Sequence, residues 1–359
     1  MTTNTIKRDS NFELLRIICM VMIIMGHISG AHRGIMDFQN LSYWVDFLIM
    51  PFVCVAVNSF VLISGYWGIK FNLRKLLKLN LQTFFYSVVI LLLSIFIGWH
   101  MFSNTKDIGF FIPVFSRKYW FITTYYALCL LSPILNLFST RLSKKEYQAT
   151  LLLGFLLFYL WPTGSFLINT GQLVDDAGYG IVNFIYLYLL GRYIRLYNVG
   201  KNIKAHYFLL GYICCGFICF GLQLALSLFL NFEFTSWQSY NTIFIIGGSV
   251  CLFLYFSRIN IQSSIINNLA KYCLAVYLIH TGPFLLESLC AEIGLKEFPG
   301  RHYVVLLFFA PIMIYLLCVL IEKIRILLFG KIEDYLIDRI CRLRIFMRIQ
   351  NFMNEITLK

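Results

Sequence analysis

Long apolar stretches alternate with short polar segments along almost the whole chain. Each stretch holds about 20 residues, which as an α-helix cross a hydrocarbon layer of about 30 Å. A helix also satisfies its own backbone hydrogen bonds, as an element that crosses a lipid bilayer must. The pattern therefore predicts an all-α fold, a polytopic transmembrane helical bundle of about ten spans. We place the spans near residues 12–30, 43–66, 79–99, 119–138, 149–163, 179–194, 206–230, 240–256, 270–289 and 303–322.

The composition agrees with this interpretation. Hydrophobic residues make up 59% of the chain and charged residues 13%, which leaves too little polar surface to cover a soluble protein of 359 residues. The eleven cysteines are scattered and lie mostly inside the apolar stretches, without a CxxC motif or a Cys/His spacing typical of metal sites. We therefore interpret them as small buried side chains and expect neither a disulfide framework nor a bound metal.

The basic charge is distributed unevenly between the two sides of the proposed spans. The chain has 30 Lys and Arg and a net charge of +13, which by itself would fit a nucleic-acid-binding protein. Six of the 30 fall on one side and the remaining 24 on the other. Such a bias marks the cytoplasmic side of a multi-pass membrane protein, so the charge indicates topology rather than nucleic-acid binding, and both termini are predicted to be cytoplasmic. The six are Arg33, Lys106, Arg117, Lys118, Lys296 and Arg301.

Three regions follow from this topology. Residues 1–11 are polar and are predicted to form a cytoplasmic N-terminal segment, followed by a transmembrane domain over 12–322. Residues 323–359 mix basic and apolar side chains. This mixture is typical of an amphipathic segment on a membrane surface, so we expect a basic cytoplasmic tail on the inner leaflet, in contact with membrane lipids.

The first span carries two ionisable residues, Arg16 and His27. Eleven residues correspond to about three helical turns plus roughly 20°, so both side chains lie on one face, roughly 16 Å apart along the axis. An ionisable residue inside a membrane is costly and normally faces the protein interior, where it marks a functional site. The pair therefore predicts a polar stripe that runs from one membrane surface into the bilayer.

The outer end of the first two spans contains further polar residues. His32 follows the first span, and we interpret it as a solvated loop histidine. Asp46 near the outer end of the second span either reaches water or contributes to the site. Pro51 cannot donate a hydrogen bond to the carbonyl of Phe47, so we expect a kink or a freed carbonyl there.

The ninth span contains a second intramembrane histidine, His280, near the middle of the bilayer. Gly282 and Pro283 follow it and release the Ile279 carbonyl from the helical ladder. A lone buried histidine is usually a hydrogen-bonded structural residue. A second histidine together with a local helix break favours a functional role, and both interpretations stay open.

Two clusters lie at the predicted membrane surfaces. Arg74, Lys75 and Lys78 share one helix face on the inner side, where they contact lipid phosphates or bind a phosphate-bearing cytosolic ligand. On the outer side, basic residues precede Tyr119 and Trp120. These aromatic side chains either anchor the helix at the interface or form a rim that stacks on sugar rings.

Five short motifs, taken in order, resemble those of the acyltransferase-3 family of integral membrane O-acyltransferases. Each motif is weak alone, but the ordered set extends along nearly the whole chain. Members of this family modify surface polysaccharides, peptidoglycan and related glycans. The motifs are Arg16-x10-His27, Ser64-Gly65-Tyr66, Arg74-Lys75-x-x-Lys78, Tyr119-Trp120-Phe121 and Tyr277-Leu278-Ile279-His280.

The resemblance implies an acyl-CoA donor, by default acetyl-CoA, on the cytosolic side. Its phosphates would bind the basic face of Arg74, Lys75 and Lys78. Glu13 and Arg16 would pair and position the donor along the polar stripe of the first span. Glu13 stands where the family often has Asp, and Lys75 and Lys78 replace Arg, so the family's bidentate phosphate contacts are absent at those two positions.

The resemblance also implies the chemistry and the acceptor. His27 would be the general base for a sugar hydroxyl or would transiently accept the acyl group, and His280 would assist proton transfer or only pack. The acceptor would be a cell-surface polysaccharide or its lipid-linked precursor, with Tyr66, Tyr119 and Trp120 as substrate-binding residues. The protein would be a multi-pass protein of the cell membrane and can form a homo-oligomer.

A flippase, polymerase or ligase for lipid-linked saccharides is the alternative. Such proteins also have ten or more spans, a positive inner side and cationic stripes that bind pyrophosphate. They would need a cation-rich outer side or a large outer loop. The six basic residues and short loops of the predicted outer side favour acyl transfer instead.

Overall fold

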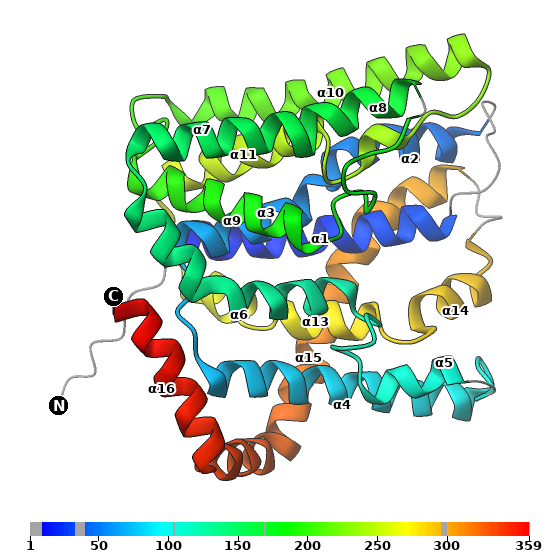
Figure 1. The fold of residues 1–359 in the computed structure, drawn as a ribbon. Coiled ribbons are helices and arrows are strands. Elements are labelled where there is room, and N and C mark those ends of the chain that lie inside the picture. Colours follow the sequence, from blue (N-terminus) through cyan, green and yellow to red (C-terminus); the bar gives the residue numbers. More distant parts are fainter. Residues whose placement is uncertain (1–8, 33–39, 103–104, 169, 296–299, 359) are drawn as a thin grey trace.

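The computed structural model describes residues 9–32, 40–102, 105–168, 170–295 and 300–358. Within these ranges the chain forms helices and no strand, which confirms the all-α prediction (Figure 1). Residues 1–8 of the predicted N-terminal segment lie outside the described residues, as do Arg33 and Lys296.

The helices follow the predicted apolar stretches, and several begin at side-chain caps. Asn72 accepts a hydrogen bond from the backbone N–H of Lys75, and Ser143 and Glu146 form a capping box. The helices are α1 (Ser10–His32), α2 (Leu41–Val53), α3 (Val55–Trp67), α4 (Leu73–Ile97), α5 (Thr105–Ile108), η1 (Gly109–Phe111), α6 (Trp120–Arg141), α7 (Lys144–Phe155), η2 (Leu156–Leu160), α8 (Trp161–Ile168), α9 (Ile181–Leu196), α10 (Ala205–Leu230), η3 (Ser236–Gln238), α11 (Ile243–Arg258), α12 (Ser264–Ala270), α13 (Cys273–His280), α14 (Leu285–Glu292), α15 (Gly300–Cys341) and α16 (Arg344–Leu358).

The described residues contain eight helical segments long and apolar enough to cross a membrane, or nine if the bent pair α13–α14 is one span. The remaining predicted span, near 179–194, corresponds to α9. With 16 residues this helix is about 24 Å long, shorter than the roughly 30 Å of a hydrocarbon core. The polytopic bundle is confirmed, and the number of ten spans stays a prediction.

The first helix lies in the centre of the bundle (Figure 1). It contacts both the helices that surround the α3–α9 core and those of the α13–α15 group. Its residues consequently contribute to both large hydrophobic clusters, with Leu15 in one and Ile24 in the other. The helices in contact with α1 are α2, α3, α11, α12, α13, α14 and α15.

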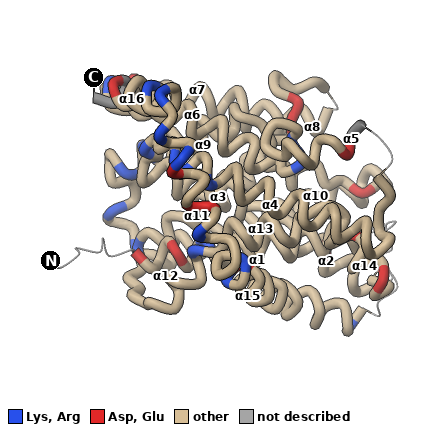
Figure 2. Tube along the Cα trace, turned by 90° about the horizontal axis from the view of Figure 1, so that it is seen from below, with Lys and Arg blue, Asp and Glu red and all other residues tan. Residues whose placement is uncertain are grey.

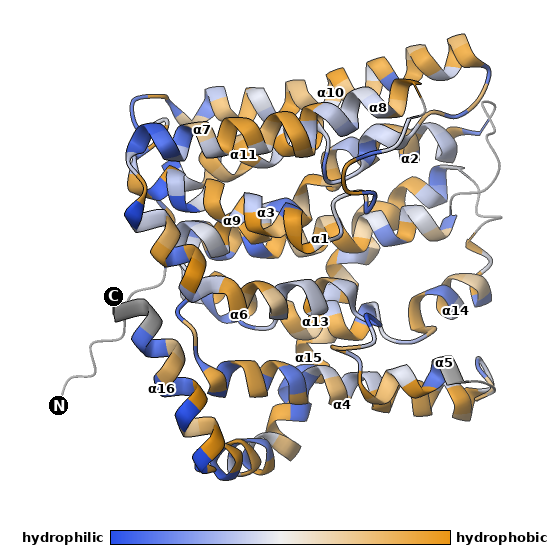
Figure 3. Ribbon diagram, viewed as in Figure 1, coloured by the Kyte–Doolittle hydropathy of each residue, from blue (hydrophilic) through white to orange (hydrophobic). Residues whose placement is uncertain are grey.

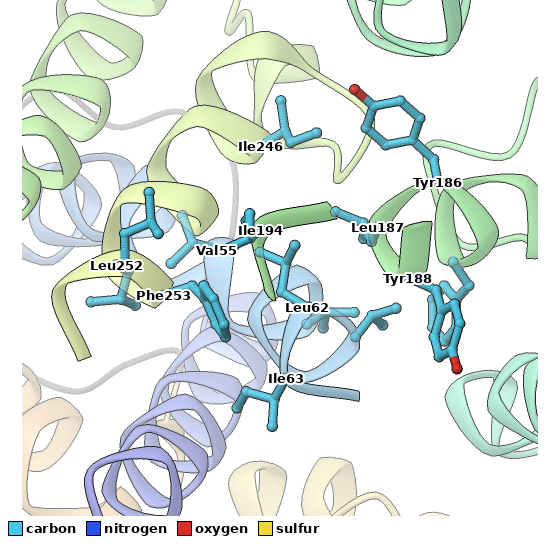
Figure 4. Close-up of a cluster of buried hydrophobic side chains, with 14 of the residues drawn as sticks. Val55, Leu62, Ile63, Tyr186, Leu187, Tyr188, Ile194, Ile246, Leu252 and Phe253 are labelled. Carbon is cyan, nitrogen blue, oxygen red and sulfur yellow. The ribbon is translucent and has the colours of Figure 1, made fainter. Parts of the chain in front are cut away.

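The larger hydrophobic cluster lies where α3, α9 and α11 meet, and Figure 4 shows Leu62, Leu187 and Phe253 within it. Two glycines allow α3 and α9 to approach closely. A Cβ atom on Gly65 would lie 2.2 Å from the Tyr188 carbonyl oxygen, and one on Gly191 would lie 2.5 Å from that of Leu62. The glycine of the Ser64-Gly65-Tyr66 motif is therefore required for this helix crossing.

Two helix breaks lie at proline-containing segments. The second predicted span is divided at Cys54 into α2 and α3, three residues after Pro51. The ninth is divided after His280, and α13 and α14 are bent by 61°. The break after His280 agrees with the prediction made from Pro283, whereas Leu41–Trp67 is long and apolar enough to form one span, so the kink expected at Pro51 stays a prediction.

One end of the bundle holds most of the Lys and Arg residues, together with α12 and α16 (Figure 2). The helix α1 begins at this end, which we call the basic end. The outward surfaces of helices such as α10 are apolar (Figure 3), and Phe217 and Leu228 on α10 are exposed, as expected for contact with lipid. The uneven charge predicted from the sequence is therefore present in the fold.

The predicted cytoplasmic tail, residues 323–359, does not start with a helix of its own. The helix α15 continues without interruption from Gly300 to Cys341, through the expected boundary at 322–323. Just past that boundary Arg325 is buried and contacts both Glu322 and Glu333. The helix α16 then packs on α6 at the basic end.

Candidate active site

Two cavities meet at His27. The inner cavity, of about 270 Å³, extends toward the basic end and includes Arg16 and Lys271. The outer cavity, of about 360 Å³, extends toward the opposite end and includes Ala177 and Thr235. The residues that line both cavities are Ile23, His27, Val57, Trp120 and Tyr240.

His27 is hydrogen-bonded to His280, the other intramembrane histidine predicted from the sequence. Nδ1 of His27 lies 3.1 Å from Nε2 of His280, and Nδ1 of His280 lies 2.6 Å from the carbonyl oxygen of Val276. A carbonyl only accepts, so Nδ1 of a neutral His280 carries the proton and its Nε2 accepts from Nδ1–H of His27. This assignment leaves Nε2 of His27 unprotonated and able to take up a proton.

The break between α13 and α14 places His280 beside α1. His280 is the last residue of α13 and is almost fully buried. The Ile279 carbonyl, predicted to be released by Pro283, instead accepts a hydrogen bond from the backbone N–H of Gly282 at 3.0 Å. The tight turn satisfies the backbone where Pro283 interrupts the helix.

The charged residues of the inner cavity lie toward the basic end. Arg16 donates from Nη1 to Oε1 of Glu13 at 2.9 Å, which confirms the expected pair. The Arg16 side chain remains one-third exposed. Arg16 and His27 both line the inner cavity, as expected from their shared helix face, and Lys271 adds a second positive charge.

The outer cavity has a different chemistry. Its lining residues, within the part of the chain that the structure describes, include no Asp, Glu, Lys or Arg. The ring of Trp120 lies edge-on to Tyr179, with centroids 4.4 Å apart, and is stacked with Tyr240 at 5.9 Å. Gln238 and Ser239 add neutral polar groups. Aromatic faces and neutral polar groups suit an uncharged polar ligand.

The predicted basic face is divided by ion pairs. Arg74 is paired with Asp338, and a second carboxylate, Asp334, lies 3.7 Å from both Arg74 and Lys78. Lys75 instead lines a third cavity at the basic end. The three residues therefore do not present a single free cationic surface.

Tyr66 and Tyr119 lie outside the two cavities that meet at His27. The hydroxyl of Tyr66 accepts a hydrogen bond from Nη1 of Arg195 at 2.9 Å. Tyr119 is 1% exposed and donates to the Leu278 carbonyl oxygen at 3.2 Å. The structure brings Trp120, of the three predicted substrate-binding residues, to the cavities.

A second buried polar cluster lies at the opposite end of α1. The interpretation of His32 as a solvated residue is wrong, because its ring is buried and its Nδ1 lies 2.6 Å from Oδ2 of Asp46. Asp46 is itself 1% exposed and also accepts a hydrogen bond from Tyr303, whose ring stacks on His32. The cluster therefore joins α1, α2 and α15.

A family model described as an acyltransferase domain matches residues 9–323, most of the chain. No curated protein and no solved structure matches this chain. The matched range contains every residue of the two cavities and of the histidine pair.

Proposed function

The chain belongs to the acyltransferase-3 family, and we propose that it moves an acyl group from acyl-CoA to a hydroxyl group of a glycan. The acyl group is acetyl in the simplest case. The acceptor is a cell-surface polysaccharide or its lipid-linked precursor. The protein acts in the cell membrane, with the basic end of the bundle in the cytoplasm.

The observation that carries this proposal is the position of His27 between two cavities of different chemistry. The inner cavity has positive charges, Arg16 and Lys271, that suit an anionic donor arriving from the basic end. The outer cavity is aromatic and uncharged, which suits a sugar. A donor and an acceptor entering from opposite ends would meet at Nε2 of His27.

The transfer uses His27 as general base and then as general acid. Nε2 of His27 takes the proton of the acceptor hydroxyl, and the oxygen attacks the thioester carbonyl carbon. The new C–O bond forms as the C–S bond breaks, and the thiolate takes the proton from Nε2, which yields an ester and free CoA. His280 holds the Nδ1–H of His27 throughout and thereby keeps Nε2 as the reactive nitrogen.

The acyl content of the host's surface polysaccharide tests this proposal. Cells would carry the wild type, His27→Ala, His206→Ala or an empty vector, and proton NMR would quantify ester-linked acyl groups. His206 is an exposed histidine at the start of α10 and serves as the matched control. We expect acyl signals with the wild type and with His206→Ala, and none with an equally abundant His27→Ala.

The same experiment separates acyl transfer from the alternative activity. A flippase, polymerase or ligase would change the length or the amount of the exported polysaccharide and leave its acylation unchanged. That result in the comparison of the wild type with the empty vector would contradict the proposal.

A further inference from the structure

A third cavity, of about 820 Å³, lies at the basic end of the bundle. Its walls come from the segment between α3 and α4, from the ends of α6 and α9, and from α16. Three of its lining residues are basic, namely Lys70, Lys75 and Arg192, and no Asp or Glu is among its described lining residues. We call it the basic cavity.

Arg192 is the most deeply placed of these cations. It lies in the last turns of α9, and its Nε atom is buried without a hydrogen-bond partner among the described residues. A Cβ atom on Gly68 would lie 2.9 Å from Nη1 of Arg192, so the guanidinium packs against a backbone that carries no side chain there. A half-buried guanidinium with no carboxylate beside it among the described lining residues is well suited to an anion.

The neighbouring cations are arranged differently. Arg74 and Lys78 face the carboxylates Asp334 and Asp338 of α15, which partly neutralise them. The C-terminal helix α16 lines the basic cavity with Gln350 and Asn354, and Oε1 of Gln350 accepts a hydrogen bond from the backbone N–H of Leu73 at 2.8 Å. The C-terminal helices therefore have two effects. The carboxylates of α15 pair with Arg74 and Lys78, which were predicted to bind phosphate, and α16 forms part of the wall of the basic cavity.

The basic cavity is close to the inner cavity along two helices. On α3, Trp67 lines the basic cavity and Ser64, one turn earlier, lines the inner cavity. On α4, Lys75 lines the basic cavity and Leu79, one turn later, lines the inner cavity. One turn of helix is about 5.4 Å, so a thin, extended ligand bound in the basic cavity could reach toward His27.

We propose that the basic cavity binds the phosphate groups at the nucleotide end of the acyl-CoA donor, with Arg192 as the principal ligand and Lys70 and Lys75 beside it. This inference rests on the proposed function. It assigns the donor's phosphates to a site other than the Arg74 and Lys78 positions of the basic motif.

Equilibrium binding separates this site from catalysis. The full-length protein would be placed in nanodiscs of zwitterionic lipid, and the dissociation constants of CoA and of pantetheine, which lacks phosphate, would be measured. Arg192→Gln is expected to weaken CoA binding about tenfold to hundredfold and to leave pantetheine binding unchanged. Arg192→Lys keeps the positive charge and should lose less CoA affinity than Arg192→Gln. Lys201→Gln, in an exposed loop at the same end, should bind CoA with the wild-type affinity.

Two results would overturn the assignment. One is wild-type affinity for CoA in a folded Arg192→Gln protein, with the large loss found in Arg74→Gln instead. The other is a wild-type protein that binds no CoA in zwitterionic nanodiscs while its thermal stability depends on anionic lipid through Arg192, which would identify a lipid-headgroup site. Inorganic phosphate should compete with CoA weakly, since it offers one of several phosphate groups.

The CoA-binding experiment and the acylation experiment can contradict the phosphate site and the proposed function separately. Loss of CoA affinity in Arg192→Gln supports the site even if surface glycans carry no acyl group, in which case the proposed acceptor chemistry fails. Glycan acylation that depends on His27, with unchanged CoA affinity in Arg192→Gln, overturns the site alone.

Discussion

Nδ1 of His27 lies 3.1 Å from Nε2 of His280, although the two residues are 253 positions apart in the sequence. Because Nδ1–H of His280 donates to the Val276 carbonyl, the proton shared between the two rings is carried by Nδ1 of His27. The pair therefore determines which nitrogen of His27 can act as the base. In the proposed mechanism His280 is therefore a positioning residue.

Replacement of His280 should lower kcat and leave the KM of both substrates unchanged. In His280→Ala the Nδ1–H of His27 loses its buried acceptor, at a cost of about 1–3 kcal/mol, which corresponds to roughly 5- to 150-fold in rate. His280→Gln can still accept this hydrogen bond and should retain more activity than His280→Ala. Steady-state kinetics of both variants check the prediction. A kcat reduced equally in His280→Ala and His280→Gln would contradict a positioning role.

Tyr179 should affect the acceptor and not the donor. It lines the outer cavity but not the inner cavity, and its ring packs against Trp120. An aromatic contact contributes about 0.5–1.5 kcal/mol, so Tyr179→Ala should raise the KM of the glycan acceptor roughly two- to tenfold. The KM of acyl-CoA should not change, and Tyr207→Ala, an exposed tyrosine at the basic end, should leave both values unchanged. A raised KM for acyl-CoA in Tyr179→Ala would mean that the donor, and not only the acceptor, occupies the outer cavity, which would contradict the proposed arrangement.

The sequence predicts those features of the site that depend on local spacing. Arg16 and His27 share a helix face because eleven residues are close to three turns, and both indeed line the inner cavity. The break after His280 follows from Pro283, which cannot continue the helical hydrogen bonds. Neither rule indicates that His27 and His280 touch, because that contact depends on how α1 and α13 pack.

Long-range charge pairing is the second feature that local patterns cannot predict. The motif Arg74-Lys75-x-x-Lys78 indicates three cations on one helix face, and nothing near it in the sequence indicates that Asp334 and Asp338 face it. The sequence also gives no sign of the role proposed for Arg192, since a basic residue near the end of an apolar helix is common in membrane proteins. His32 was misinterpreted because Asp46 and Tyr303, its partners, lie in other helices.

Arg325 should be important for stability. Its guanidinium is 5% exposed and contacts the buried carboxylates of Glu322 and Glu333. Removal of one partner from a buried ionic cluster typically costs about 3–5 kcal/mol, because the remaining charges stay buried without compensation. Thermal unfolding in one detergent should show a Tm several degrees lower for Arg325→Ala than for Lys331→Ala, an exposed residue of the same helix. Equal Tm values would show that the cluster does not hold α15.

Asp46 should hold the end of α2 against α1 and α15. In Asp46→Ala both His32 and Tyr303 lose a buried hydrogen-bond partner, at about 1–3 kcal/mol for each group. Amide hydrogen exchange over Leu41–Val53 should therefore become faster. Asp175→Ala provides the control, since Asp175 is exposed. Unchanged exchange in Asp46→Ala would mean that apolar packing alone fixes this end of the bundle.

The central claim is that His27 performs acyl transfer between the two cavities. Its most direct test is the transfer of radiolabelled acetyl from acetyl-CoA to polysaccharide in isolated membranes that contain the wild type or His27→Gln. Loss of a general base lowers a rate by about 10²–10⁴-fold, and we expect a loss of this size in His27→Gln with unchanged affinity for CoA. Transfer by His27→Gln at the wild-type rate would contradict the claim.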